Sequence, residues 1–231
     1  MSETLRVGGL VPLTTLDFPG RLACVLFCQG CGWKCRYCHN PQLIPSRGDS
    51  ELAWADIRAF LEQRVGLLEA VVFSGGEPTL QAALADAIDE VRALGFKVGL
   101  HSAGIKPKLL AKVLPRVDWI GFDVKALPED SALITGVQGS GEANWRSLEL
   151  LLDSGVDHEC RTTVHWHLFD AAKLWRLAER LRATGVERFA VQLVRTARML
   201  DEHLPEARAP YDQQTLWDRL DRLFPSFVLR G

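Results

Sequence analysis

Short apolar runs alternate along the chain with stretches of helical periodicity. The apolar runs predict strands at residues 22–27, 70–73, 97–100, 119–124, 158–164 and 188–194, and a short final strand at 226–229. The intervening spacing predicts helices at residues 51–66, 80–94, 107–114, 144–152, 171–183 and 211–223. These make about six βα units, too few to close an eight-stranded barrel. The pattern therefore predicts an α/β fold with an open, partial parallel (β/α)6 barrel.

Length and composition are those of an ordinary globular protein. The chain has 231 residues, so we expect residues 1–231 to form a single domain. Hydrophobic residues make up 47% and charged residues 24%, and the net charge of -2 gives no electrostatic basis for binding nucleic acid or an anionic membrane. The N-terminus lacks the features of a signal peptide, and no apolar run approaches the ~20 residues that span a bilayer. We therefore expect a cytoplasmic protein that binds neither nucleic acid nor membrane.

Cysteines are crowded near the N-terminus, and three of them form a C-x3-C-x2-C pattern at Cys31, Cys35 and Cys38. Such crowding is typical of a metal or cluster site in a reducing compartment. Three thiolates can hold three corners of a cubane iron–sulfur cluster, which normally has four cysteine ligands. The fourth iron is then free to bind a molecule that is not protein, which favours an enzyme over an electron carrier.

Two alternatives to a three-cysteine cluster site are a structural zinc site and a cluster with Cys28 as its fourth ligand. A structural zinc site normally has a second cysteine pair, which this chain lacks, and His39 is awkwardly placed beside Cys38 for the same metal. Cys28 gives a further C-x2-C spacing, but as a fourth ligand it would close the open iron. Cys24 lies within an apolar run and is typical of a buried cysteine that packs as a small hydrophobic residue.

The cysteine spacing, with Tyr37 before the last cysteine, resembles the radical S-adenosylmethionine (SAM) superfamily. The resemblance implies a [4Fe-4S] cluster on Cys31, Cys35 and Cys38, which serve as both catalytic and metal-binding residues. The open iron would bind the amino and carboxylate groups of SAM, and Tyr37 would lie near the adenine.

A second motif follows one strand later, at Ser74-Gly75-Gly76-Glu77-Pro78. By itself this motif is typical of a turn followed by the start of a helix, with glycines that allow the backbone to approach a ligand closely. After the cysteine loop, it resembles the SAM-binding motif of the same superfamily. The resemblance assigns Gly75, Gly76, Glu77 and Pro78 to the methionine end of SAM.

The residues around the cysteines resemble the glycyl-radical enzyme activases. The matching segments are Asp17-Phe18-Pro19-Gly20, Gln29-Gly30-Cys31 and Cys38-His39-Asn40-Pro41. The short chain, without a ferredoxin insert, is similar to activators of anaerobic ribonucleoside-triphosphate reductase. The resemblance implies reductive cleavage of SAM to a 5′-deoxyadenosyl radical, which removes a hydrogen from a glycine of that partner enzyme. Flavodoxin or ferredoxin is the implied electron donor.

Further polar residues at later strand ends are candidate SAM contacts. Asp123 and Lys125 match an Asp-x-Lys of formate-lyase activators and share one strand face, although an ordinary ion pair would look the same. Ser102 follows His101, where those activators carry an acid. Arg161 and Arg195 are candidates for binding a carboxylate by bidentate hydrogen bonds.

Two other functions fit parts of the pattern. One is a radical SAM enzyme acting on a small molecule, such as a deazapurine precursor, for which we identify no dedicated substrate-binding residues. The other is an iron–sulfur electron carrier, which the three-cysteine count and the Gly-Gly-Glu-Pro motif disfavour.

Overall fold

The computed structural model describes residues 4–195, 199–205, 208–210 and 212–231. One sheet contains eight strands: β1 (Val7–Thr14), β2 (Ala23–Cys28), β3 (Ala70–Gly75), β4 (Lys97–Ser102), β5 (Trp119–Asp123), β6 (Asp157–Val164), β7 (Arg188–Leu193) and β8 (Ser226–Arg230). Their spatial order is their order along the chain. β1 is antiparallel to β2, and all later pairs are parallel. β1 and β8 form opposite edges of the sheet, so the predicted open, largely parallel α/β architecture is confirmed.

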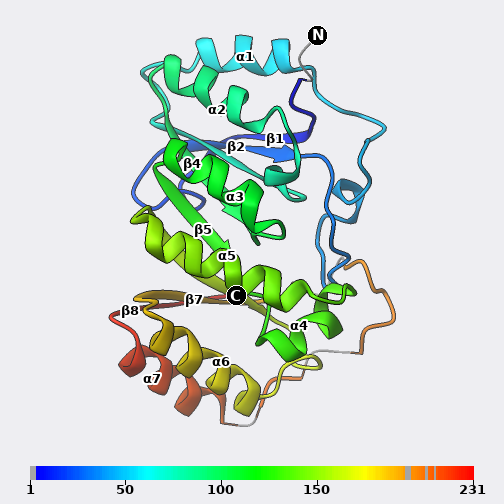
Figure 1. Ribbon diagram of the computed structural model, residues 1–231, viewed down its shortest axis with the longest axis vertical. Helices are drawn as coiled ribbons and strands as arrows, with labels where there is room; N and C mark the ends of the chain where they lie inside the picture. Colours follow the sequence, from blue (N-terminus) through cyan, green and yellow to red (C-terminus); the bar gives the residue numbers. More distant parts are fainter. Residues whose placement is uncertain (1–3, 196–198, 206–207, 211) are drawn as a thin grey trace.

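Helices cover one face of this sheet, as Figure 1 shows. They are α1 (Trp54–Glu62), α2 (Leu84–Ala93), α3 (Pro107–Val113), α4 (Pro128–Thr135), α5 (Ser140–Ser154), α6 (Ala171–Thr184) and α7 (Gln213–Leu223). In the described part of the chain, three short 3-10 turns lie in the connections between strands and helices: η1 (Pro41–Leu43), η2 (Pro78–Leu80) and η3 (Leu114–Arg116). Among the described residues, none of the helices has the length and apolar character needed to cross a membrane.

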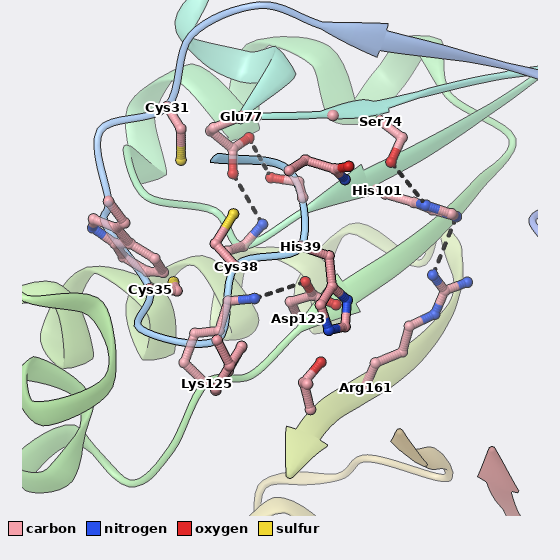
Figure 2. Close-up of a pocket in the computed structure, with 18 of the residues that line it drawn as sticks. Cys31, Cys35, Cys38, His39, Ser74, Glu77, His101, Asp123, Lys125 and Arg161 are labelled. Atoms are coloured by element: carbon pink, nitrogen blue, oxygen red, sulfur yellow. Dashed lines mark hydrogen bonds and ion pairs between the residues drawn. The ribbon is translucent and has the colours of Figure 1, made fainter. Parts of the chain in front are cut away.

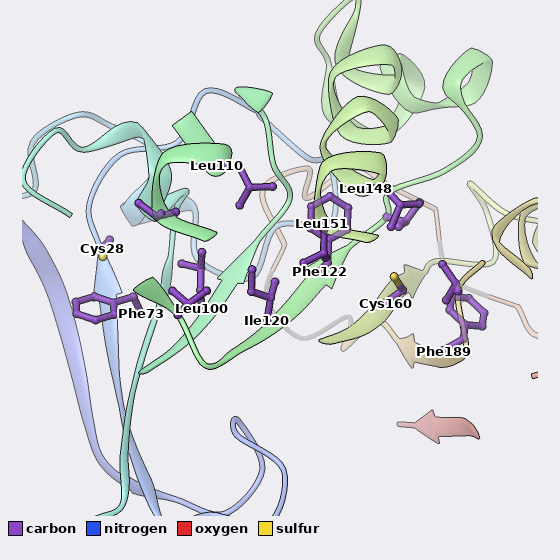
Figure 3. Packing of buried hydrophobic residues seen from close by; sticks show 14 of the residues in the cluster. Cys28, Phe73, Leu100, Leu110, Ile120, Phe122, Leu148, Leu151, Cys160 and Phe189 are labelled. Carbon is purple, nitrogen blue, oxygen red and sulfur yellow. The ribbon is translucent and has the colours of Figure 1, made fainter. Parts of the chain in front are cut away.

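The inner strands β2 to β7 are largely buried on both faces, which explains their nearly continuous apolar sequences. In β2, Cys24 and Leu26 pack into the large core beneath the helices, whereas Ala23 and Val25 belong to a smaller core on the opposite face. Figure 3 shows part of the large core, including Phe73, Leu100 and Phe122. The smaller core fills the interior of the curved sheet and leaves the carboxyl ends of the strands to polar side chains.

Several elements differ from the sequence prediction. The pattern missed β1, because its glycines, proline and half-exposed positions give little apolar signal. It also missed α4 and placed the start of the second helix at residue 80, where the chain makes only the short turn η2 before α2. The predicted last helix began at Tyr211, which lies outside the described residues, and α7 begins at Gln213.

Candidate active site

The carboxyl ends of strands β2 to β7 surround a cavity of about 510 Å³. This is the end of a parallel α/β barrel at which active sites form. Every residue predicted for the cofactor site lines this cavity, apart from Pro78. Pro78 is buried at the first position of η2, where its fixed backbone angle starts the turn. The fold therefore brings together residues that are spread from Cys31 to Arg195 along the chain.

The three motif cysteines lie on the loop after β2, and Figure 2 shows them at one end of the cavity. Burial raises the pKa of Cys31 to about 12 and also raises the pKa of Cys35. These thiols are therefore protonated at neutral pH until a metal displaces the proton, because the thiolate is the ligating form. Among the described residues, no group of three or more His, Cys, Asp or Glu side chains is placed to hold a single metal ion. A cubane cluster requires a wider arrangement, since each thiolate binds a different iron atom.

Cys28 lies outside the cavity. It is the last residue of β2, and its side chain is fully buried in the large hydrophobic core (Figure 3). Burial raises the pKa of the Cys28 thiol well above its ordinary value. Its position is that of a packed core residue, as is that of Cys24 and Cys160.

The Gly75–Gly76 turn packs directly against the start of the cysteine loop. The amide of Gly76 donates to the Cys28 carbonyl at 3.0 Å, and the amide of Glu77 donates to the Gly30 carbonyl at 2.8 Å. Gly75 has a positive φ of 115°, and a Cβ at Gly76 would come within 2.3 Å of the Gly30 oxygen. Both glycines are thus required for the contact between the two motifs.

Glu77 is 1% exposed and is held by neutral donors. Its Oε1 accepts hydrogen bonds from the hydroxyls of Thr79 at 2.6 Å and Ser102 at 2.7 Å, and its Oε2 accepts one from the Ala103 amide at 3.0 Å. Burial raises the pKa of Glu77, and these hydrogen bonds oppose that shift. Glu77 therefore links the turn after β3 to the end of β4.

Lys125 and Asp123 form an ion pair with an Nζ–Oδ2 distance of 2.8 Å. Burial disfavours both charges, but the pair outweighs it, raising the pKa of Lys125 and lowering that of Asp123. Lys125 Nζ also lies 6.0 Å from the centroid of the Tyr37 ring. The Tyr37 hydroxyl is buried without a hydrogen-bond partner in the described part of the chain, which leaves a polar atom for a ligand to satisfy.

Asn144 of α5 is a functional neighbour that the sequence did not indicate. Its amide nitrogen donates to the carbonyls of Ala103 at 2.7 Å and Asp123 at 2.9 Å, and its oxygen accepts from the Lys125 amide at 3.2 Å. It therefore ties the ends of β4 and β5 together beneath the ion pair. A lone asparagine inside a helix carries no local signal of such a role.

His101 lines the cavity on the side away from the three cysteines, between Ser74 and Arg161 (Figure 2). Its Nε2 lies 2.9 Å from the Asp17 carbonyl oxygen, and its Nδ1 lies 3.2 Å from Ser74 Oγ. Arg161 Nη1 also lies 3.2 Å from Nε2, and a guanidinium only donates, so Nε2 faces one acceptor and one donor. The contact with the Asp17 carbonyl is the shorter of the two, so we assign the proton to Nε2, and Nδ1 then accepts from the serine hydroxyl. Burial, together with the nearby Arg161 charge, lowers the pKa of His101 to about 4, so the ring is neutral at physiological pH.

Arg161 lies across the inner face of the sheet and is 6% exposed. Its guanidinium stands 5.0 Å above the Trp119 ring, and its Nε donates to Glu159 Oε1 at 3.0 Å. A Cβ at Gly121 would come within 2.4 Å of the guanidinium carbon, so glycine makes room for the side chain. Arg230 of β8 completes the group with bidentate hydrogen bonds to Glu159 at 2.7 and 2.8 Å. Sequence reasoning missed Glu159, Gly121 and Arg230, which show no motif spacing.

Phe18 explains part of the Asp-Phe-Pro-Gly segment. Its ring stacks on Trp119 with centroids 5.4 Å apart and belongs to the smaller core inside the curved sheet. The Asp17 carboxylate accepts from the Thr14 hydroxyl at 2.6 Å, which fixes the turn after β1. Phe18 and Trp119 thus form the apolar floor below the polar cavity.

A second cavity of about 600 Å³ adjoins the first on the open side of the sheet. It extends to Leu229 and Arg230 of β8 and to Leu16 in the turn after β1. The two cavities share the lining residues Asp17, His39, Arg161, Thr163, Gln192 and Arg195. A ligand can therefore approach the first cavity from between the two edge strands.

Comparison with known proteins gives related sequences over most of the chain. It is 28% identical over 221 residues to MJ1227 of Methanocaldococcus jannaschii, a protein assigned to the glycyl-radical enzyme activating enzymes, covering 90% of this chain and 88% of that one. It is 29% identical over 140 residues to the pyruvate formate-lyase-activating enzyme of Clostridium pasteurianum, covering 57% of each chain.

Solved structures share the fold at lower identity. SuiB of Streptococcus suis bound to S-adenosylmethionine superimposes with a TM-score of 0.66 at 16% identity. The match covers 88% of this chain and 48% of SuiB, so the chain spans about half the length of that protein. The model of the radical SAM superfamily matches residues 25–181, which include both the cysteine loop and the Gly75–Gly76 turn. The chain is therefore a member of the radical SAM superfamily, whose enzymes use a [4Fe-4S] cluster and S-adenosylmethionine.

Proposed function

We propose that this protein is an activating enzyme that generates a glycyl radical on a partner enzyme. The observation that carries the proposal is the packing of the cysteine loop against the Gly75–Gly76 turn at one end of a polar cavity. The two aligned relatives described above are named as activating enzymes of this kind. An activase also needs an approach for a protein segment, and the second cavity on the open side of the sheet offers one.

The residues present fit the two cofactors. Cys31, Cys35 and Cys38 would hold the cluster, and the Gly75–Gly76 turn packs against the start of the loop that carries them. The Tyr37 hydroxyl, which has no hydrogen-bond partner among the described residues, and the Asp123–Lys125 pair offer polar contacts to SAM. When bound, the cluster supplies the electron for reductive cleavage of SAM.

The protein groups bind, orient and exclude water. The buried Phe18–Trp119 floor closes the cavity below, and neutral His101 keeps its ring in one orientation between Ser74 and Asp17. Glu77 acts through Ser102 and Ala103, because its carboxylate oxygens are occupied by internal hydrogen bonds. Ser102, Arg161 and Arg195 complete the cofactor contacts that we assign to this cavity.

Anaerobic ribonucleoside-triphosphate reductase is the partner we propose, with flavodoxin or ferredoxin as the electron donor. No further cysteine follows Cys38 before β3, so this region has no ferredoxin-type insert, and in this it resembles the activators of that reductase. The test incubates anaerobically reconstituted protein, SAM and a chemical reductant with the candidate reductase. Electron paramagnetic resonance should then show a glycyl-radical doublet on the reductase.

Two controls show whether the doublet depends on the cluster and on the radical glycine of the reductase. A Cys35→Ala variant should form neither the doublet nor 5′-deoxyadenosine, because one cluster ligand is missing. A reductase with alanine in place of its radical glycine should accept no radical. Formation of 5′-deoxyadenosine by the wild type without a doublet on the reductase would contradict the proposed partner. Failure of the wild type to cleave SAM would contradict the activase function itself.

A further inference from the structure

The two halves of the cysteine loop are supported in different ways. The half that carries Cys31 is bound locally: the Gly30 amide donates to the Leu43 carbonyl at 2.8 Å, and the Cys31 amide donates to the Ile44 carbonyl at 3.0 Å. The Gly75–Gly76 turn adds the contact to Gly30 described above. This half therefore depends on residues close in sequence and on the Gly75–Gly76 turn beside it.

The half that carries Cys35 and Cys38 is bound by two distant segments. On one side, the amides of Lys34 and Arg36 donate to the carbonyls of Thr135 and Ile134, each at 3.0 Å. These carbonyls are at the C-terminal end of α4, where a helix leaves its last acceptors unpaired. The loop thus caps α4, and α4 in turn holds the loop.

The second support comes from residues 199–204, which follow β7. The Leu200 amide donates to the Cys38 carbonyl at 3.0 Å, and the Asp201 amide donates to the Arg36 carbonyl at 2.9 Å. In Figure 1 this segment runs beside the cysteine loop at the edge of the molecule. This contact joins two residues, Arg36 and Asp201, that are 165 positions apart in the sequence.

Arg36 is the point at which these supports meet. Its side chain makes an ion pair with Asp201, with Nε and Oδ2 2.8 Å apart. Asp201 Oδ1 also accepts from the His203 amide at 3.1 Å, so the carboxylate is oriented from both sides. Both side chains are only partly exposed, at 33% and 26%. Arg36 therefore holds the stretch between Cys35 and Cys38 through its amide, its carbonyl and its side chain.

We propose that residues 199–204 are an anchor of the cluster loop, and that Arg36 and Asp201 are positioning residues for the thiols of Cys35 and Cys38. The proposal rests on the proposed function only in placing the cluster on the three cysteines. It predicts that retention of the cluster depends on an ion pair made with a segment that follows β7, five strands after the cysteine loop.

The experiment measures cluster loss rather than turnover. Wild type and an Arg36→Gln variant are reconstituted anaerobically, and iron and sulfide per chain are determined. The visible absorbance of the cluster is then followed in the presence of an iron chelator. Glutamine keeps the backbone hydrogen bonds and removes the charge, so we expect cluster loss to be about two- to fivefold faster, as for a partly exposed ion pair.

The matched control is Arg146→Gln, which removes an arginine paired with Glu149 at 2.7 Å on the exposed face of α5. It should lose the cluster at the wild-type rate. Thermal unfolding of the cluster-free proteins should not separate the two variants, which distinguishes cluster positioning from a general loss of stability.

A double-mutant cycle with Asp201→Asn tests whether the two residues act as a pair. We expect the double variant to lose the cluster no faster than either single variant. Equal loss rates for Arg36→Gln and Arg146→Gln, or fully multiplicative effects in the cycle, would overturn the proposal. A wild type that holds the cluster but forms no radical on the reductase would contradict the proposed function and leave this anchor intact.

Discussion

Glu77, which follows β3, and Glu159 of β6 are two buried carboxylates whose surroundings differ in charge. Glu77 is 1% exposed and accepts hydrogen bonds from two hydroxyls and two backbone amides. Glu159 is 8% exposed and lies between the guanidinium groups of Arg161 and Arg230. One carboxylate is surrounded by neutral donors, and the other by two fixed positive charges.

The difference decides the protonation of each group. Burial raises the pKa of Glu77, and its neutral donors do not fully compensate. Burial acts in the same direction on Glu159, but the two arginines outweigh it and lower its pKa. Glu159 is thus a permanent counter-charge for Arg161 in the interior, whereas Glu77 is a hydrogen-bond acceptor that joins β3 to β4.

The largest predicted effect comes from Glu159→Gln. It leaves the buried guanidinium of Arg161 without its carboxylate, and breaking a buried pair costs about 3–5 kcal/mol. Urea denaturation of the variant and wild type measures this change in the free energy of unfolding. Asp157→Asn is the control on the same strand, since Asp157 pairs with Arg188 where both side chains are about half exposed. We expect its change to be below about 1 kcal/mol. If both variants lowered the free energy of unfolding by a similar amount, the buried Glu159–Arg161 pair would be no stronger than the exposed Asp157–Arg188 pair.

A smaller effect is expected for Glu77→Gln. The amide keeps one acceptor oxygen but directs its NH₂ group toward a former donor, leaving a neutral group unpaired. The expected cost is in the lower part of about 1–3 kcal/mol, because no charge is left uncompensated. The same denaturation measurement applies, with Glu62→Gln on the exposed surface of α1 as the control. If Glu77→Gln lowered the free energy of unfolding as much as Glu159→Gln, neutral donors and positive charges around a buried carboxylate would not differ in their effect on stability.

The pH dependence should be the smallest effect, with opposite signs at the two sites. The folded protein lowers the pKa of Glu159 below its ordinary value of 4.5. Its contribution to the free energy of unfolding is therefore present above pH 4.5 and is lost as the pH falls through the folded pKa. The folded protein raises the pKa of Glu77. Its contribution to the free energy of unfolding is therefore present below pH 4.5 and is lost as the pH rises through the folded pKa.

Unfolding free energies of wild type and both glutamine variants, measured from pH 7 downward, check this prediction. The difference between wild type and Glu159→Gln should shrink as pH falls below 4.5. The difference between wild type and Glu77→Gln should grow as pH falls toward that value. The same trend in both variants would contradict the assignment of opposite shifts.

The sequence alone was sufficient for the features that depend on neighbouring residues. The spacing of Cys31, Cys35 and Cys38 fixes three thiols on one loop, and Gly75 and Gly76 provide the backbone freedom for the turn after β3. Alternation of apolar strands with helices set the open α/β architecture, because both faces of a parallel sheet must be covered. Each of these is a local property of the chain, and each is therefore visible without coordinates.

Only the tertiary structure decided which distant residues meet around those motifs. Arg230 reaches Glu159 because β8 is parallel to β7 and adds to the sheet beside it, and Gly121 leaves space for Arg161 because β5 lies between β4 and β6. Arg36 meets Asp201 only after the chain has passed through strands β3 to β7. A single charged residue or glycine has no periodicity, so its partner is set by strand register and packing rather than by any pattern along the sequence.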